Sequence, residues 1–156
     1  MHTLIPTATR QHAAAQTRGG IIRWCCLLLL CSAYLQGGLQ KALDFPAAVA
    51  EMHHFGLSPA APLALATIAG ELLASILVLS GRMRWAGAVY LAGFTLAANL
   101  VANRFWDMSG MARTMAQNGF CEHLGLAGAF LLVAWNDWTR DDRFSRHTPA
   151  RREPSV

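Results

Sequence analysis

Charged residues are scarce in this sequence, and the motifs that bind common redox cofactors are absent from it. Aspartate, glutamate, lysine and arginine make up 14% of the 156 residues, whereas 54% are hydrophobic. Because an ordinary soluble domain is about 25% charged, this composition excludes a typical soluble protein and favours a membrane protein. No haem, flavin, nucleotide or iron–sulfur motif occurs, so we expect no redox cofactor of its own and no independent redox catalysis.

Cysteine is also rare, and its spacing excludes the usual thiol sites. The four cysteines are Cys25, Cys26, Cys31 and Cys121. They form neither a CxxC pair nor a zinc-like spacing, so we interpret them as small apolar side chains. His53 and His54 are adjacent, but a metal site needs further ligands at suitable spacing. We therefore interpret the two histidines as ordinary loop polarity and expect no metal site.

Four apolar stretches approach the length of about 20 residues that a helix needs to cross a bilayer. They are residues 21–39, 60–79, 85–101 and 120–138. The fourth stretch is the least apolar, because it begins with Glu122 and His123, whose polar ends must snorkel or be buried. The pattern predicts an all-α integral membrane protein, built as a four-helix bundle.

Polar segments flank the predicted bundle. We expect a cytoplasmic N-terminal segment at residues 1–20, a membrane domain at 21–138 and a cytoplasmic C-terminal tail at 139–156. Residues 149–154 are predicted to fray. Arg10 and Arg18 precede an apolar run, as in a signal peptide, but no convincing cleavage pattern follows it. The first span is therefore expected to be retained.

The distribution of arginine and lysine predicts which side of the membrane each loop faces, because cytoplasmic loops hold an excess of both. Ten of these residues lie near the termini or in the turn between the second and third stretches. They are Arg10, Arg18, Arg23, Arg82, Arg84, Arg140, Arg143, Arg146, Arg151 and Arg152. Only Lys41, Arg104 and Arg113 fall on the opposite side. We therefore predict that both termini are cytoplasmic, and the net charge of +4 needs no nucleic-acid partner.

Polar residues recur at helical spacing inside two of the apolar stretches. Thr67, Glu71 and Ser75 are four residues apart and therefore share one helix face. The next stretch repeats this spacing at Thr95, Asn99 and Asn103. An isolated carboxylate inside a bilayer costs at least a few kcal/mol, so Glu71 must be paired, protonated or hydrated. Lys41, near the outer end of the first span, is a candidate counter-ion.

The ionisable and amide side chains gather toward the non-cytoplasmic half of the predicted bundle. The candidate lining of a polar pocket is Lys41, Glu71, Asn99, Asn103, Trp106, Glu122 and His123. Two interpretations of this set stay open. In one, the side chains form hydrogen bonds that hold the helices together. In the other, they line a pocket for a quinone-like or other small ligand, or a proton path. No catalytic residue is assigned.

Several segments occur together in a characteristic order. They are "GGLQKALDFPAAVAEMHHFGL" at 37–57, the stretch around Glu71, "GRMRWAG" at 81–87, "NRFWDMSG" at 103–110 and "NGFCEHLGLAGAFLLVA" at 118–134. As an ordered set they resemble the DoxX family of small four-helix bacterial membrane proteins. The resemblance implies a multi-pass protein of the bacterial cell inner membrane.

The resemblance also gives individual residues a place in the family pattern. Lys41 matches the lysine that closes the first helix, and Glu71 matches the acidic residue of the second. Further matches are the turn at Asp44, Phe45 and Pro46 and the aromatic pair Phe105 and Trp106. Two positions differ from the pattern, because Asn103 replaces a common histidine and Glu122 replaces a usual lysine. The second change reverses a charge at the outer mouth of the expected pocket.

Members of this family are associated with respiratory or sulfur oxidoreduction, including thiosulfate:quinone oxidoreduction, and with complexes that detoxify oxidants. The resemblance thus implies a subunit of a membrane oxidoreductase system, with a quinone and a redox partner protein as partners in the lipid bilayer. The alternative hypothesis is a non-enzymatic anchor or assembly factor that binds a partner through outer loops at 44–59 and 104–119. A third hypothesis is a metal or small-solute carrier, motivated by His53, His54, Met108, Met111 and Met115.

Overall fold

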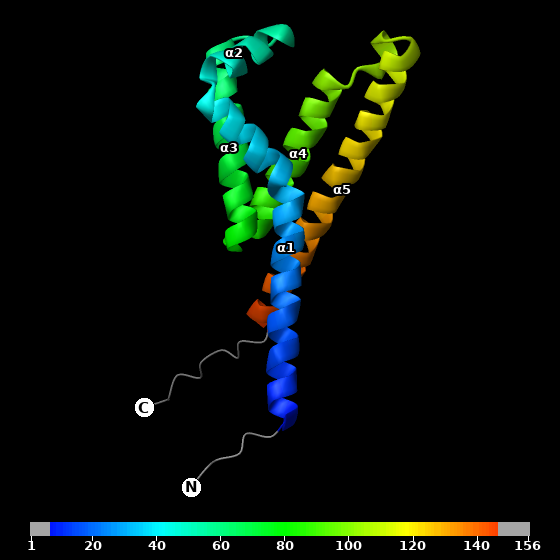
Figure 1. Cartoon of the computed structure of the whole chain (residues 1–156). Helices are drawn as coiled ribbons and strands as arrows, with labels where there is room; N and C mark the ends of the chain where they lie inside the picture. Colours follow the sequence, from blue (N-terminus) through cyan, green and yellow to red (C-terminus); the bar gives the residue numbers. More distant parts are fainter. Residues whose placement is uncertain (1–6, 147–156) are drawn as a thin grey trace.

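The structure, a computed structural model, describes residues 7–146 and the side chains of residues 19–139. This part of the chain consists of helices and short connections (Figure 1). The elements are α1 (Thr7–Leu43), α2 (Phe45–His54), α3 (Ala60–Ser80), α4 (Arg84–Ala102), the 3₁₀ helix η1 (Phe105–Asp107) and α5 (Gly110–Arg146). The predicted all-α class is confirmed. Residues 149–154, predicted to fray, lie outside the described residues.

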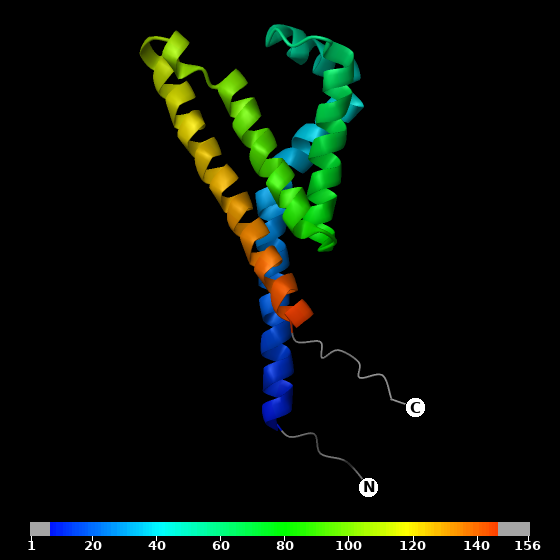
Figure 2. The same cartoon turned by 180° about the vertical axis from the view of Figure 1, so that it is seen from behind.

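The four long helices run alternately in opposite directions, and α2 lies across the end of α1 and α3 (Figures 1 and 2). The turn between α3 and α4 faces the same end of the molecule as the start of α1 and the end of α5. We call this the turn end, and we call the opposite end, with α2 and η1, the loop end. Toward the loop end, α1 and α3 diverge from α4 and α5.

Three helical segments are long and apolar enough to cross a membrane, namely Gly19–Leu43, Ala60–Ser80 and Arg84–Asp107. They contain the predicted spans at 21–39, 60–79 and 85–101, which are confirmed as apolar helices. The predicted span at 120–138 lies within α5, which is less apolar as a whole. With 37 residues, α5 is about 55 Å long and exceeds the hydrocarbon core of about 30 Å. The fourth crossing and the orientation of the termini stay predictions.

The start of α5 differs from the sequence expectation. The sequence predicts an outer loop at 104–119, but α5 already begins at Gly110, so most of that segment is helical. Strong helix formers such as Ala112, Met115 and Ala116 favour this extension. Gly119 does not interrupt the helix, and it leaves space beside Asn103, whose Oδ1 would lie 3.1 Å from an added side-chain carbon. Close packing of α4 on α5 thus outweighs the low helix propensity of glycine.

Small residues set the distance between α3 and α4. A side-chain carbon added at Gly87 would lie 2.7 Å from the carbonyl oxygen of Ala74, so only glycine allows the two backbones to approach this closely. Val78, Ala88 and Leu91 are fully buried around this contact. The main apolar core therefore lies near the turn that joins these two helices.

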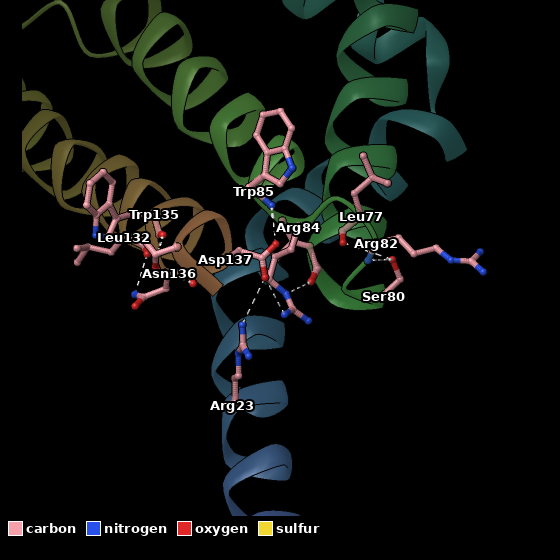
Figure 3. A network of polar contacts seen from close by, with 12 residues as sticks. Arg23, Leu77, Ser80, Arg82, Arg84, Trp85, Leu132, Trp135, Asn136 and Asp137 are labelled. Carbon is pink, nitrogen blue, oxygen red and sulfur yellow. Dashed lines mark hydrogen bonds and ion pairs between the residues drawn. The ribbon is translucent and has the colours of Figure 1, made fainter. Parts of the chain in front are cut away.

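A cluster of charged side chains joins the helices at the turn end (Figure 3). Asp137 Oδ1 of α5 lies 3.4 Å from Arg84 Nη1 of α4 and 3.7 Å from Arg23 Nη2 of α1. Asp137 Oδ2 accepts a hydrogen bond of 3.2 Å from the backbone N–H of Trp85. Arg84 Nε donates a hydrogen bond of 2.8 Å to the Val78 carbonyl, which lies in the last turn of α3. The cluster therefore connects all four long helices.

We predict that Gly87→Ala destabilises the protein and that Gly93→Ala, on the same helix, does not. The added carbon at position 87 meets the α3 backbone, and such overpacking costs about 1–3 kcal/mol. Gly93 has open space around it. The effect of alanine there is set by helix propensity alone, which raises the free energy of unfolding by up to about 1 kcal/mol. Thermal unfolding of both variants in one mild detergent measures the difference. Equal unfolding temperatures would contradict the close α3–α4 contact.

We also predict that the turn end faces the cytoplasm. In a cysteine-free background, Met111→Cys at the start of α5 should react with a membrane-impermeant maleimide in intact cells, and Arg82→Cys in the α3–α4 turn should react only after permeabilisation. A fluorescent protein that folds only in the cytoplasm, fused to the C-terminus, should fluoresce if α5 crosses the membrane. A dark fusion with the same cysteine pattern would show that α5 does not cross.

Candidate functional site

A polar pocket of about 220 Å³ lies between α1, α3, α4 and α5. Its polar lining is Tyr34, Lys41, Thr67, Glu71, Thr95 and His123. We call it the central pocket. It brings together three members of the predicted set, since Lys41, Glu71 and His123 come from three different helices.

The carboxylate of Glu71 is paired with Lys41. Glu71 is only 6% exposed, and its Oε1 lies 3.6 Å from Lys41 Nζ. Glycines on α1 make this pairing possible, because a side-chain carbon added at Gly38 would lie 2.9 Å from Leu72 Cγ on α3. The absence of that carbon lets α1 approach α3 where the lysine must reach the carboxylate. The expected role of Lys41 as counter-ion therefore agrees with the geometry.

The second oxygen of the same carboxylate is unsatisfied. Glu71 Oε2 is buried and has no hydrogen-bond partner among the described residues. It lies 3.5 Å from the place where a side-chain carbon would stand on Gly37, so it faces space that glycine leaves open. A buried polar atom without a partner costs about 1–3 kcal/mol, and more when it is charged. The central pocket therefore contains an acceptor that a ligand with a hydrogen-bond donor would satisfy.

A chain of hydrogen bonds links α1 and α4 at the wall of the central pocket. Thr95 Oγ1 donates to the Leu91 carbonyl. Because that bond uses the threonine hydroxyl proton, Tyr34 Oη must be the donor in its own hydrogen bond to Thr95 Oγ1. The Tyr34 ring also packs edge-on against Phe130, with ring centroids 5.4 Å apart. The tyrosine oxygen is therefore fixed at the pocket and keeps its acceptor capacity.

His123 contributes a ring with an assigned proton. Its Nδ1 lies 2.6 Å from the Gly119 carbonyl oxygen one turn earlier on α5. A carbonyl oxygen only accepts, so Nδ1 carries a proton and donates it. This bond orients the ring and leaves Nε2 for another partner. His123 thus supplies the central pocket with a nitrogen from the α5 side.

A second pocket of about 430 Å³ adjoins Lys41 between α1 and α2. We call it the α2 pocket. Gly37 and Lys41 line both pockets, whereas Asp44 and Glu51 line only the second. Glu51 Oε2 lies 4.0 Å from Lys41 Nζ, and the Glu51 side chain is 44% exposed. The same ammonium group therefore lies between a buried carboxylate and a hydrated one.

The two asparagines of the predicted set do not line the central pocket. Asn99 is 1% exposed, and its Nδ2 donates a hydrogen bond of 3.0 Å to the Phe120 carbonyl of α5. Asn103 Nδ2 donates to Asn99 Oδ1 over 2.8 Å. The Asn99 bond corresponds to the first interpretation of the polar residues, hydrogen bonding between helices, whereas the Asn103 bond stays at the C-terminal end of α4.

Trp106 and Glu122 also lie outside the lining of the central pocket. Trp106 is 48% exposed and packs edge-on against Phe105 and Phe120, with centroids 5.2 Å and 6.2 Å away. Glu122 is exposed on α5. The charge reversal at Glu122 therefore leaves the pocket wall unchanged. Among the described residues, no group of three or more His, Cys, Asp or Glu side chains is placed to hold a metal ion.

Sequence reasoning missed Glu51, the second partner of Lys41. The signal was present, because α2 buries Ala48, and Glu51 lies three residues later and is therefore its neighbour on the helix surface. A carboxylate beside the buried face of a short helix is a candidate partner for a lysine that ends the preceding helix. Tyr34 and Thr95, although they fall inside predicted spans, were also absent from the predicted pocket lining.

We predict that Lys41→Met lowers the free energy of unfolding by about 3 kcal/mol, because it leaves the buried carboxylate of Glu71 without its cation. Adding Glu71→Gln to Lys41→Met should restore much of that loss, since no uncompensated buried charge remains. Thermal unfolding of the single and double variants in mild detergent gives the coupling between the two positions. Glu122→Gln is the control for loss of an exposed charge. Strictly additive effects of the two substitutions would contradict a direct ion pair.

Comparisons with known proteins agree with the helical architecture. The DoxX family model matches residues 24–104, slightly more than half of the chain. The chain is 30% identical over 97 residues to the inner membrane protein YphA of Escherichia coli (strain K12). The aligned region covers 62% of this chain and 69% of that protein. No solved structure gives a significant match. The matched region contains the Lys41–Glu71 pair, all of α3 and α4 and most of the apolar part of α1, and the chain belongs to the DoxX family.

Proposed function

We propose that this protein is the membrane subunit of a quinone-linked oxidoreductase system and that its central pocket receives a quinone head group. The proposal is carried by one observation, the buried and unpartnered Oε2 of Glu71 at a pocket that also contains the Lys41 ammonium group. Membership of the DoxX family and the similarity to a protein named as an inner membrane protein support a multi-pass location in the bacterial inner membrane.

The groups around the pocket match the two states of such a ligand. A quinone offers carbonyl oxygens that accept hydrogen bonds, and its reduced form offers hydroxyl donors. Lys41 is a donor, whereas Glu71 Oε2 and His123 Nε2 are acceptors, because the His123 ring proton is on Nδ1 and is donated to the Gly119 carbonyl. A site with both kinds of group can therefore hold either state. Tyr34, whose hydroxyl proton is engaged by Thr95, keeps only acceptor capacity toward a ligand.

The size of the pocket fits a head group and excludes a whole lipid-soluble quinone. Its volume of about 220 Å³ is below the range of about 300–1,000 Å³ for pockets that enclose a drug-sized ligand. The long apolar tail of a membrane quinone would have to remain in the lipid. Apolar side chains such as Leu65, Leu73 and Leu96 are exposed on α3 and α4, and these surfaces are compatible with that environment.

This chain supplies binding, charge and protons, and a redox partner protein supplies the electrons. The sequence contains no motif for an electron-carrying cofactor, so the electrons must come from another protein. Glu71, Lys41 and His123 are the groups on this chain that can stabilise charge or exchange protons at the ligand. The alternative, an anchor or assembly factor, predicts that these groups serve stability alone.

The test is purification of the tagged protein from its native membrane in mild detergent, followed by extraction of bound quinone and mass spectrometry of co-purifying proteins. We predict that wild-type protein retains quinone. The Glu71→Gln variant should retain at most about a tenth of that amount, because a hydrogen bond to a charged group is lost. Glu122→Gln, which neutralises an exposed carboxylate outside the pocket, is the matched control and should retain the wild-type amount.

Two results would overturn the proposal. One is wild-type protein without quinone but with a constant set of co-purifying proteins, which would favour the anchor. The other is equal quinone retention by wild type and Glu71→Gln when both variants are folded at the temperature of purification. The folded fraction is checked by thermal unfolding of the same preparations.

A further inference from the structure

The Lys41 side chain stands at the junction of two pockets. Its Nζ lies 3.6 Å from Glu71 Oε1 on the side of the central pocket and 4.0 Å from Glu51 Oε2 on the side of the α2 pocket. Gly37 also lines both pockets. Because glycine has no side chain, Lys41 supplies the one side chain among the described residues that lines both of these pockets. An added carbon at Gly37 would lie 3.5 Å from Lys41 Nζ.

The two carboxylates differ in how strongly they attract the lysine. The Glu71 side chain is 7% exposed and the Glu51 side chain is 44% exposed. Charges attract more strongly where water is excluded, so the buried carboxylate is the stronger partner. The lysine stem is long and flexible, and its ammonium group is well hydrated. A small rotation of that stem can therefore exchange the buried partner for the exposed one.

We propose that Lys41 is a gate that controls the access of water and protons from the α2 pocket to Glu71 and the central pocket. When Lys41 pairs with Glu71, its side chain fills the junction and the passage is closed. When it turns toward Glu51, the passage is open. Glu51 is thus a functional residue of the site, the partner that holds the gate open.

This gate rests on the proposed function, because quinone chemistry requires proton exchange. Interconversion of a quinone and a quinol exchanges two electrons with the redox partner and two protons with water. Glu71 lies in a buried position, so these protons need a route through protein. A hydrogen-bond donor of the ligand that binds Glu71 Oε2 reduces the negative charge that Glu71 presents to Lys41. The attraction between Lys41 and the buried carboxylate is then weaker. Ligand entry and opening of the passage are therefore coupled.

The experiment measures how fast a water-soluble thiol reagent reaches the central pocket. Single cysteines are placed at Thr67 on α3 and at Ala98 on α4, both of which line that pocket, in a background in which the native cysteines are replaced by alanine. Gln40→Cys in the α2 pocket reports delivery of the reagent. Leu96→Cys, exposed on the apolar surface of α4, reports leakage through lipid. Lipid nanodiscs expose both faces of the protein to the reagent.

Three substitutions at the gate change the labelling rate in different directions. Lys41→Ala removes the gate and Glu71→Gln removes its closed partner, so both should speed labelling at positions 67 and 98 by about tenfold, equivalent to about 1.4 kcal/mol. Glu51→Gln removes the open partner and should slow labelling at the same positions. The labelling rate at position 67 or 98 is divided by the labelling rate of Gln40→Cys in the same gate variant. This ratio is the measured quantity, and the division corrects for the altered local charge.

Unchanged ratios in all three variants would overturn the gate. Faster labelling in Glu51→Gln would also overturn it, because general loosening of the bundle raises all rates whereas a gate gives opposite signs. Labelling is measured without any quinone, so its outcome is separate from quinone retention. The predicted ratios together with a protein that retains no quinone would leave the gate standing and remove the redox role.

Discussion

The burial of the Glu71 carboxylate is the constraint on which the rest of the molecule depends. A charge in that position requires a cation, and the cation comes from the end of α1. For Lys41 to reach Glu71, α1 must lie close to α3, which the glycines at positions 37 and 38 permit. The same approach places α2 across the ends of these helices and brings Glu51 to the lysine. Helix packing and site geometry thus have one physical cause.

Polar residues inside the bundle fall into two groups that polarity alone does not separate. Asn99 and Asn103 have their donors engaged, and they connect α4 to α5 or to each other. Glu71 keeps an oxygen without a partner beside a pocket. The difference lies in whether hydrogen-bonding capacity is used up within the protein. Groups with capacity left over are those on which a binding role can be built.

The parts of the structure that were predictable from the sequence are those set by local pattern. Length and apolarity predict α3 and α4, and four-residue spacing places Glu71 on an inward face. The Lys41–Glu71 pair was foreseen as a possibility, but its contact depends on how closely α1 approaches α3. Asp137 was missed because it acts across helices and lies 53 positions from Arg84 in the sequence. Such contacts depend on the angle between helices, which no local pattern contains.

The two ends of the bundle are mechanically unequal. Asp137 and Arg84 connect the four long helices at the turn end, where the apolar core also lies. At the loop end the α1–α3 pair and the α4–α5 pair diverge (Figures 1 and 2). Residues of all four long helices line the central pocket, which lies between the Asp137 cluster at the turn end and the separated helix ends at the loop end. A change in the separation of the two helix pairs at the loop end would therefore change the width of the pocket and leave the packing at the turn end in place.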